Sequence, residues 1–166
     1  LDHGRRLIPK HGISCHVLLL HPQSRGTVKL ASGDFRRAPL IDFCYLTHPQ
    51  DVATLLEGTK RTAAIFDTPT FKQRVKRDLL TAHCKTDADW TEFVRNVAGT
   101  NYHPVGTCRM GSDRDAVVDA RLRVHGLQGL RVVDSSIMPT IPGGNTMAPS
   151  IMIGEKGADM IKADWR

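Results

Sequence analysis

One histidine of this 166-residue chain lies in a setting that suits proton transfer. Residues 101–111 read NYHPVGTCRMG, so His103 stands between a tyrosine and a proline. Pro104 favours an extended backbone at His103, and Gly106 permits a tight turn or the close approach of a flat ligand. An imidazole with an ordinary pKa of about 6.5 can accept a hydroxyl proton at neutral pH, which is what the oxidation of an alcohol asks of a base. A loop histidine satisfied by a neighbouring group is the alternative.

A second run, PGGNTMAP at residues 142–149, opens a predicted helix. Asn145 follows two glycines, and its amide can donate a hydrogen bond to an oxygen as well as accept one. The alternative is an asparagine that serves a left-handed turn or a helix cap. A helix that begins at Thr146 presents free N–H groups and the positive end of its dipole, and such an end stabilises an anion. A reduced flavin, which carries negative charge around N1 and the C2 carbonyl, is one anion that this helix end could stabilise.

Asp134 ends a short hydrophobic stretch, Leu130–Val133, and is followed by two serines. A carboxylate at the end of a strand is typical of ligand contacts in α/β sheets. A capping role for the turn at Ser135 and Ser136 is the alternative, and the sequence does not choose between them.

Composition excludes several function classes. The net charge is +6, but the chain has only 5% aromatic residues and its densest basic run, residues 72–77, reads as a solvated helix face, so we expect no nucleic-acid partner. The four cysteines match no zinc spacing, and we expect no metal site. The apolar runs are too short to span a bilayer, and we expect no transmembrane segment. The chain is expected to be cytoplasmic, with membrane association through an electron acceptor as an alternative.

The pattern of elements predicts an α+β fold, a mostly antiparallel sheet packed against helices. Alternation predicts a strand at residues 13–20, a turn, and a returning strand at residues 27–30, with a further strand at 40–46. Helical spacing predicts a helix at residues 51–66. A short basic helix is predicted at 69–83. A third helix opens with a capping box at Thr86 and continues with an apolar stripe at helical spacing, Trp90, Phe93, Val94 and Val97. Short strands are predicted at 122–124 and 130–133, and a final helix at 146–163. The character changes near Gly99, which predicts two parts, residues 1–99 and 100–166.

These residues resemble the C-terminal region of the glucose–methanol–choline (GMC) oxidoreductase family. Collinear matches cover roughly residues 13–165: PQSRGTV at 22–28, the histidine segment 101–111, VD at 118–119 with VHGLQGLRVVD at 124–134 and Ser136, and GNT at 144–146 with the helix after it. Asn145 is similar to the choline dehydrogenase-like branch, since other branches place a second histidine there.

The resemblance implies roles. His103 would be the catalytic base beside flavin N5, and Asn145 would hydrogen-bond the alkoxide oxygen. Contacts to FAD would come, largely through backbone, from Asp134, Ser135, Asn145, Thr146 and Met147. Residues 1–99 would belong to the substrate-binding domain, and residues 100–166 would return to the FAD-binding α/β domain of the full enzyme.

The family's G-x-G-x-x-G fingerprint has no counterpart here, and the chain begins with Leu1. We therefore expect an excised C-terminal piece that lacks the N-terminal FAD-binding half and is inactive alone. The complete protein is expected to be an FAD-dependent alcohol dehydrogenase acting on small CH–OH donors. A non-catalytic ligand-binding or interaction module that keeps only the fold is the alternative.

Overall fold

The computed structural model describes residues 11–165, and these divide into two compact units. Unit 1 takes the described residues of the segments Leu1–Leu19, Gln23–Arg25 and Cys44–Asn101. Unit 2 takes those of Leu20–Pro22, Gly26–Phe43 and Tyr102–Arg166. Each unit therefore combines segments that are distant in the sequence. The division into residues 1–99 and 100–166 stays a prediction about the domains of a complete enzyme.

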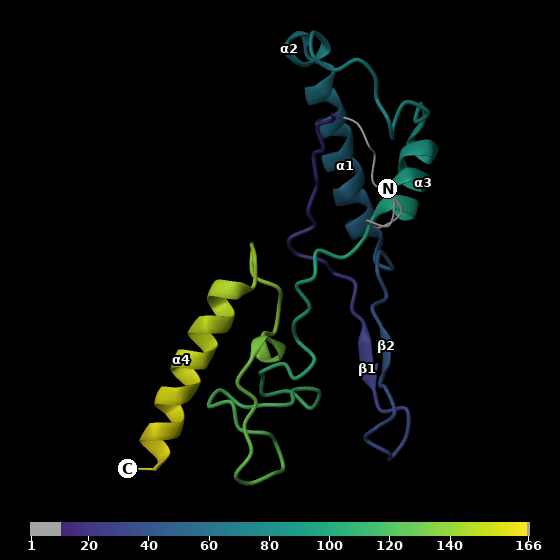
Figure 1. Cartoon of the computed structure of the whole chain (residues 1–166). Coiled ribbons are helices and arrows are strands. Elements are labelled where there is room, and N and C mark those ends of the chain that lie inside the picture. The colour runs from purple at the N-terminus through teal and green to yellow at the C-terminus, as the bar shows by residue number, and fades with distance from the viewer. Residues whose placement is uncertain (1–10, 166) are drawn as a thin grey trace. The chain divides into compact units, whose positions relative to one another are not determined.

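Unit 1 is built on two helices, α1 (Pro49–Phe66) and α3 (Asp87–Val97), which lie side by side in Figure 1. The capping box that the sequence predicts at the start of α3 is confirmed: the Thr86 hydroxyl accepts from the Asp89 N–H, and the Asp89 carboxylate accepts from the Thr86 N–H. Val94 is buried and the other members of the predicted apolar stripe are less so. The short helix α2 (Pro69–Lys72) follows α1.

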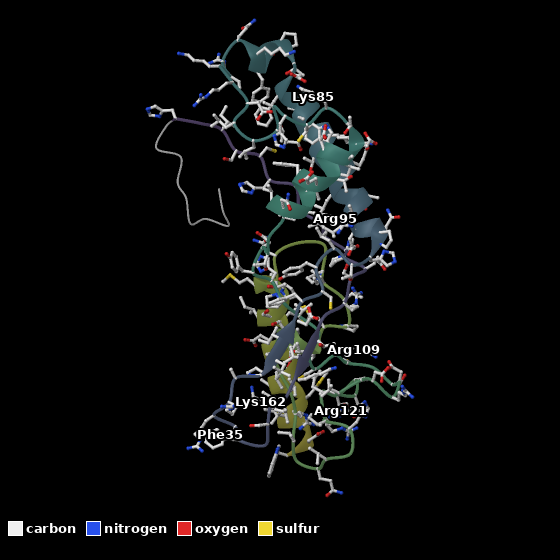
Figure 2. The ribbon with its side chains drawn as sticks, turned by 90° about the vertical axis from the view of Figure 1, so that its right-hand side faces the viewer. Phe35, Lys85, Arg95, Arg109, Arg121 and Lys162 are labelled. Atoms are coloured by element: carbon white, nitrogen blue, oxygen red, sulfur yellow. The ribbon has the colours of Figure 1, made fainter. Side chains whose placement is uncertain are left out.

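Unit 2 contains the sheet and the last helix. Strands β1 (Thr27–Lys29) and β2 (Leu40–Asp42) pair antiparallel, with Val28 opposite Ile41. Their connecting loop carries Phe35, whose side chain is 94% exposed (Figure 2). The 3-10 helix η1 (Ser135–Ile137) contacts α4 (Met147–Asp164). The core of this unit is formed by five buried side chains: Val118, Leu122, Ile137, Met138 and Ile153.

Helix α4 approaches the chain near Val133 very closely. A Cβ atom added to Gly157 would lie 2.3 Å from Cγ1 of Val133, so only glycine fits at this point. Ile153, one turn earlier on the same face, belongs to the core. The core therefore fixes α4 against the segment that leads into η1, and with it the loop that opens the helix.

The predicted strand at residues 13–20 is wrong. No strand is formed there, and Val17 packs against helix α1, where a Cβ at Gly58 would lie 2.6 Å from its Cγ1. Alternation describes the two faces of a strand, but a strand also needs a neighbouring backbone to pair with. The strand predicted at 27–30 is confirmed as β1, which pairs with β2 instead.

Four other predictions were too long. The strand predicted at 40–46 ends at Asp42, because Cys44 and Leu46 adopt left-handed backbone conformations that a strand does not tolerate. The helix predicted at 69–83 ends at Lys72. The strands predicted at 122–124 and 130–133 are reduced to single bridges, Val118 with Val124 and Arg123 with Arg131. The α+β class holds in a coarse form, as helices with one small antiparallel sheet in the described residues.

Candidate active site

The loop that carries His103 is attached to η1 by its backbone. The Cys108 N–H donates to the Ser136 carbonyl at 3.0 Å, and the Met110 N–H donates to the Ile137 carbonyl at 2.7 Å. Gly106 turns the loop with a φ of +88°, and a Cβ there would lie 3.2 Å from the Met138 carbonyl oxygen. Because Ile137 of η1 belongs to the buried core of unit 2, these hydrogen bonds anchor the loop to that core. The His103 side chain is half-buried.

The structure brings His103 to the beginning of α4. Thr146 Oγ1 lies 3.0 Å from Nδ1 of His103, across 43 positions of sequence. Thr146 is the N-cap residue of α4, and its own side chain makes no capping hydrogen bond to the helix. The hydrogen bond to His103 therefore joins the two sequence motifs at a single point. The sequence placed both residues at the predicted site, but it did not predict this contact.

Asn145 precedes Thr146 and is exposed. It lies in a turn in which the Gly144 N–H donates to the Pro142 carbonyl at 2.8 Å. The Asn145 amide therefore belongs to the residue directly before Thr146, the contact partner of His103.

A further imidazole, which the sequence did not single out for this site, borders the same turn: a Cβ at Gly143 would lie 3.7 Å from Nε2 of His21. No local sequence signal marks His21, because 122 positions separate it from Gly143 (143 − 21).

The other predicted site residues lie at the starts of η1 and α4. Asp134 is the N-cap residue of η1, and its carboxylate accepts from the Ser136 N–H at 2.7 Å, as the capping alternative proposed. Ser135 is half-buried in η1, on the helix to which the His103 loop is attached. Met147 is the first residue of α4, and its side chain is exposed. The contacts that these residues would make with FAD stay predictions.

Arg109, which carries no predicted chemistry, forms an ion pair. Its guanidinium donates to both carboxylate oxygens of Asp113, at 2.9 and 2.5 Å. The hydrogen bond from Arg109 and one from the Asp115 N–H lower the pKa of Asp113 to about 2. Both side chains are therefore engaged with each other near the surface.

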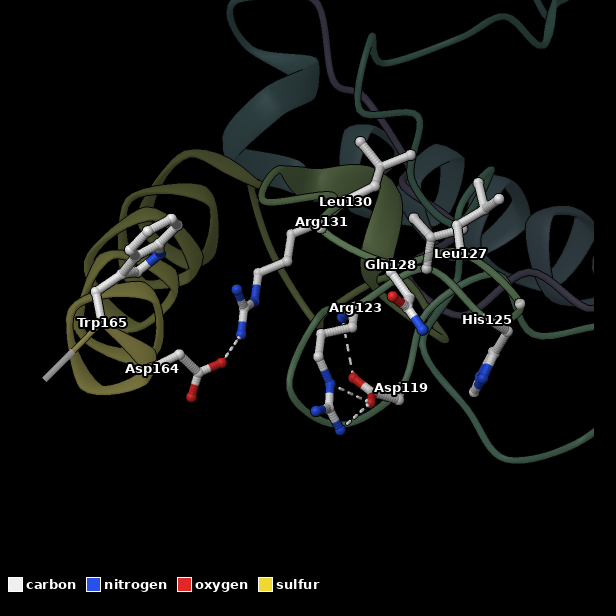
Figure 3. Close-up of a pocket in the computed structure, with 12 residues that line it drawn as sticks. Asp119, Arg123, His125, Leu127, Gln128, Leu130, Arg131, Asp164 and Trp165 are labelled. Carbon is white, nitrogen blue, oxygen red and sulfur yellow. Dashed lines mark hydrogen bonds and ion pairs between the residues drawn. The ribbon is translucent and has the colours of Figure 1, made fainter.

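A pocket of about 600 Å³ lies in unit 2 between residues 119–131 and the C-terminal end of α4 (Figure 3). Its cations are paired: Arg123 donates to Asp119, and Arg131 donates to Asp164. Hydrogen bonds from the Arg123 backbone and side chain help to lower the pKa of Asp119 to about 2, although burial opposes this. None of the predicted site residues lines this pocket, so we treat it as a structural feature and not as the reaction site.

Unit 1 holds a buried carboxylate that the sequence analysis missed. Asp51, near the start of α1, is 1% exposed. It accepts from the Gln23 N–H and the Ser24 N–H, each at 2.8 Å, and from the Ser24 hydroxyl at 2.5 Å. Ser24 Oγ in turn accepts from the His48 N–H. This network fastens Gln23 and Ser24 to the start of α1. An acidic residue in the first turn of a predicted helix is a weak local signal, and its partner lies 27 positions away.

Within residues 11–165, no group of three or more histidine, cysteine, aspartate or glutamate side chains could hold a metal ion. In that same range, no helix is both long enough and apolar enough to cross a membrane.

Comparison with known proteins relates this chain to one family of oxidoreductases. The GMC oxidoreductase model for the family's C-terminal domain matches residues 22–154. The alcohol dehydrogenase [acceptor] of Pseudomonas putida is 45% identical over 161 residues, which are 96% of this chain and 29% of that protein. The oxygen-dependent choline dehydrogenase of Escherichia coli O45:K1 (strain S88 / ExPEC) is 48% identical over 160 residues, 96% of this chain and 28% of that protein.

A solved oxidoreductase structure is also similar to this chain. The FAD-dependent oxidoreductase from Chaetomium thermophilum matches with a TM-score of 0.80 and 31% sequence identity, over 89% of this chain and 26% of that one. The chain thus spans less than a third of the length of the relatives that it matches. The family match over residues 22–154, together with the identity to the curated relatives, shows that the chain belongs to the GMC oxidoreductase family and corresponds to its C-terminal domain.

Proposed function

We propose that this chain is the C-terminal part of an FAD-dependent alcohol oxidoreductase. In this reaction the hydroxyl of a small alcohol would give its proton to His103, and N5 of a bound flavin would accept the hydride from the same CH–OH carbon. The contact between His103 and Thr146 at the start of α4 is the observation that carries the proposal, because it gathers the base, Asn145 and a helix N-terminus in one place.

His103 and Asn145 have different roles in this reaction. With Nδ1 facing Thr146, the opposite nitrogen of His103, Nε2, is left to accept the hydroxyl proton. Such a positioned general base accelerates a reaction by about 10²- to 10⁴-fold. The Asn145 amide N–H donates to the substrate oxygen as negative charge develops on it. Because Asn145 is exposed on its turn, its amide is accessible to a ligand.

The residues present fit a flavin at this position. The first N–H groups of α4 lack a side-chain cap from Thr146, and the positive end of an 18-residue helix favours a neighbouring anion. A Cβ at Gly144 would meet no atom within 4 Å, so the turn before the helix leaves room for a flat group. Bound FAD would supply the hydride acceptor. Backbone and side-chain contacts from Asp134, Ser135, Asn145, Thr146 and Met147 would hold it.

We further propose that FAD binding and turnover require the additional polypeptide that the longer relatives contain. Helix α4 supports this, because several of its large apolar side chains lie outside the core. Met147, Ile151 and Met152 are 73%, 58% and 54% exposed. Exposed apolar side chains that lie close together are typical of a surface that packs against further polypeptide. The 166 residues alone are expected to be inactive.

The substrate class follows from Asn145 and from the relatives. One relative is named for choline and another for alcohols, and both are proposals for this chain. The test is an activity screen of this chain joined to the FAD-binding portion of a GMC relative, with a panel of alcohols and an artificial dye as electron acceptor. We expect dye reduction with at least one small alcohol. A protein that binds FAD in full yet reduces no dye with any alcohol would instead support a non-catalytic module.

A further inference from the structure

In the described residues three helices have a threonine N-cap, Thr68 for the four-residue α2, Thr86 for α3 and Thr146 for α4, and the threonines of the two longer helices behave differently. Thr86, at the start of α3, has the extended backbone of an N-cap residue (φ −111°, ψ 165°), and its hydroxyl accepts from the Asp89 N–H. Thr146, at the start of α4, has a helical backbone (φ −86°, ψ −3°), and its hydroxyl accepts nothing from the helix. A threonine N-cap ordinarily stabilises its helix through that bond. The Thr146 hydroxyl therefore serves another partner.

The sequence removes one of the two usual cap partners of this hydroxyl. An N-cap side chain accepts from the N–H of the second or third helical residue. The third helical residue of α4 is Pro149, which has no N–H. The Thr146 backbone is still integrated in the helix, since its carbonyl accepts from the N–H and the hydroxyl of Ser150. Only the side chain is free of the helix, and it lies 3.0 Å from Nδ1 of His103.

We propose that Thr146 is a positioning residue that holds His103 with its proton on Nδ1. In this arrangement Nδ1–H donates to Thr146 Oγ1, and the lone pair of Nε2 faces the substrate. The proposal rests on the proposed function, in which His103 is the base. It adds that the correct tautomer and ring orientation depend on a neutral hydroxyl presented by the start of α4.

A hydroxyl suits this task through the whole reaction. Nδ1–H can donate to Oγ1 while the ring is neutral, and it can still donate after Nε2 has taken the substrate proton. The bond is therefore kept in both protonation states, and the ring does not have to turn between them. A hydroxyl also adds no charge beside the imidazole, so it orients the ring without forming an ion pair with it.

The first test needs no cofactor and uses the 166-residue chain. The nitrogen shifts of His103, assigned by long-range ¹⁵N–¹H NMR, report which ring nitrogen carries the proton. We compare the wild type with Thr146→Val, which removes the hydroxyl and keeps the shape, and with Thr146→Ser, which keeps the hydroxyl. Thr86→Val is the matched control, because it removes a threonine hydroxyl at the start of another helix.

We expect the Nδ1–H tautomer in the wild type, a shift toward Nε2–H in Thr146→Val, and a return to the wild-type pattern in Thr146→Ser. Thr86→Val should lower the melting temperature and leave the His103 shifts unchanged. Identical His103 shifts in the wild type and Thr146→Val, or a wild type that already has Nε2–H, would overturn the proposal.

A second test separates this proposal from the proposed function. In the enzyme joined to its FAD-binding portion, Thr146→Val should slow flavin reduction at saturating alcohol roughly tenfold, which is about the factor for one lost hydrogen bond. KM should change little, and Thr146→Ser should restore the rate to within about twofold. If the NMR result holds but His103→Ala reduces flavin at the wild-type rate, the proposed function fails while the coupling between Thr146 and His103 stands. If His103→Ala is slow but Thr146→Val changes neither tautomer nor rate, only the positioning role fails.

Discussion

Replacing Asp51 with asparagine should destabilise unit 1 far more than the replacement of an exposed carboxylate on the same helix. All three groups that Asp51 contacts in this network donate to it: the Gln23 N–H, the Ser24 N–H and the Ser24 hydroxyl. An asparagine has one acceptor oxygen, and its NH₂ group would face a backbone donor. Hydrogen bonds to a charged group contribute about 1.5–3 kcal/mol each and are not additive. We expect Asp51→Asn to lower the free energy of unfolding by about 2–4 kcal/mol.

The control is Glu57→Gln, also on α1. Glu57 forms an i, i+4 ion pair with Arg61 at 2.7 Å, and both side chains are mostly exposed. Such a pair contributes less than about 1 kcal/mol. The assay is urea unfolding followed by tryptophan fluorescence. Trp90 of unit 1 is half-buried whereas Trp165 is already exposed, so the signal follows unit 1. With a slope of about 2 kcal/mol per molar urea, Asp51→Asn should lower the midpoint by roughly 1–2 M.

The same variant makes a prediction about pH. Burial alone would raise the pKa of Asp51, but the hydrogen bonds from Gln23 and Ser24 outweigh it and hold the pKa below its ordinary value of 3.8. A carboxyl group whose pKa is lowered by folding stabilises the protein above its unfolded pKa, and this contribution is lost as the pH falls through the folded pKa. The difference between the wild type and Asp51→Asn should therefore be full at pH 6 and shrink below about pH 4. Equal midpoints for Asp51→Asn and Glu57→Gln at pH 6 would refute the reasoning.

Two further predictions concern unit 2. Gly157→Ala should destabilise this chain by about 1–3 kcal/mol, because the new Cβ would lie 2.3 Å from Val133. Gly154→Ala on the same helix meets no atom within 4 Å and should be neutral or stabilising by up to about 1 kcal/mol. Thermal unfolding compares the two variants directly, and an equal loss of stability in both would contradict the close approach of α4. Arg109→Gln should raise the pKa of Asp113 from about 2 toward 3.8, as followed by carboxyl ¹³C NMR, and an unchanged value would mean that Arg109 is not its cause.

The helices of this chain were predictable because their signals are local. The i, i+3, i+4 spacing located α1 to within a few residues, and the capping box at Thr86 marked the start of α3. Strands were harder, since alternation at residues 13–20 does not reveal whether a partner backbone is present. The left-handed residue Cys44, which follows β2 closely, has no sequence signature either.

The candidate site was predictable as a set of residues and not as a geometry. The two motifs pointed to His103 and Asn145 through residue type, and the family resemblance gave them roles. The contact that joins the motifs spans 43 positions and depends on the buried core that packs η1 against α4. His21 and Gly143, which lie close to each other, are separated by even more positions of sequence. Such contacts arise from packing, which periodicity and propensity do not specify.

The most direct test of the central claim is the rate of flavin reduction in the enzyme formed by this chain and the FAD-binding portion of a relative. Stopped-flow absorbance at saturating alcohol would compare the wild type with His103→Ala. His125→Ala is the control, because its ring contacts a backbone carbonyl away from the predicted site, and His21→Ala tests the other imidazole near the turn. We predict a loss of about 10²- to 10⁴-fold for His103→Ala with FAD content unchanged, and a change within about twofold for His125→Ala. Reduction of the flavin by His103→Ala at the wild-type rate would contradict the account, and a large loss in His21→Ala alone would transfer the role of base to that residue.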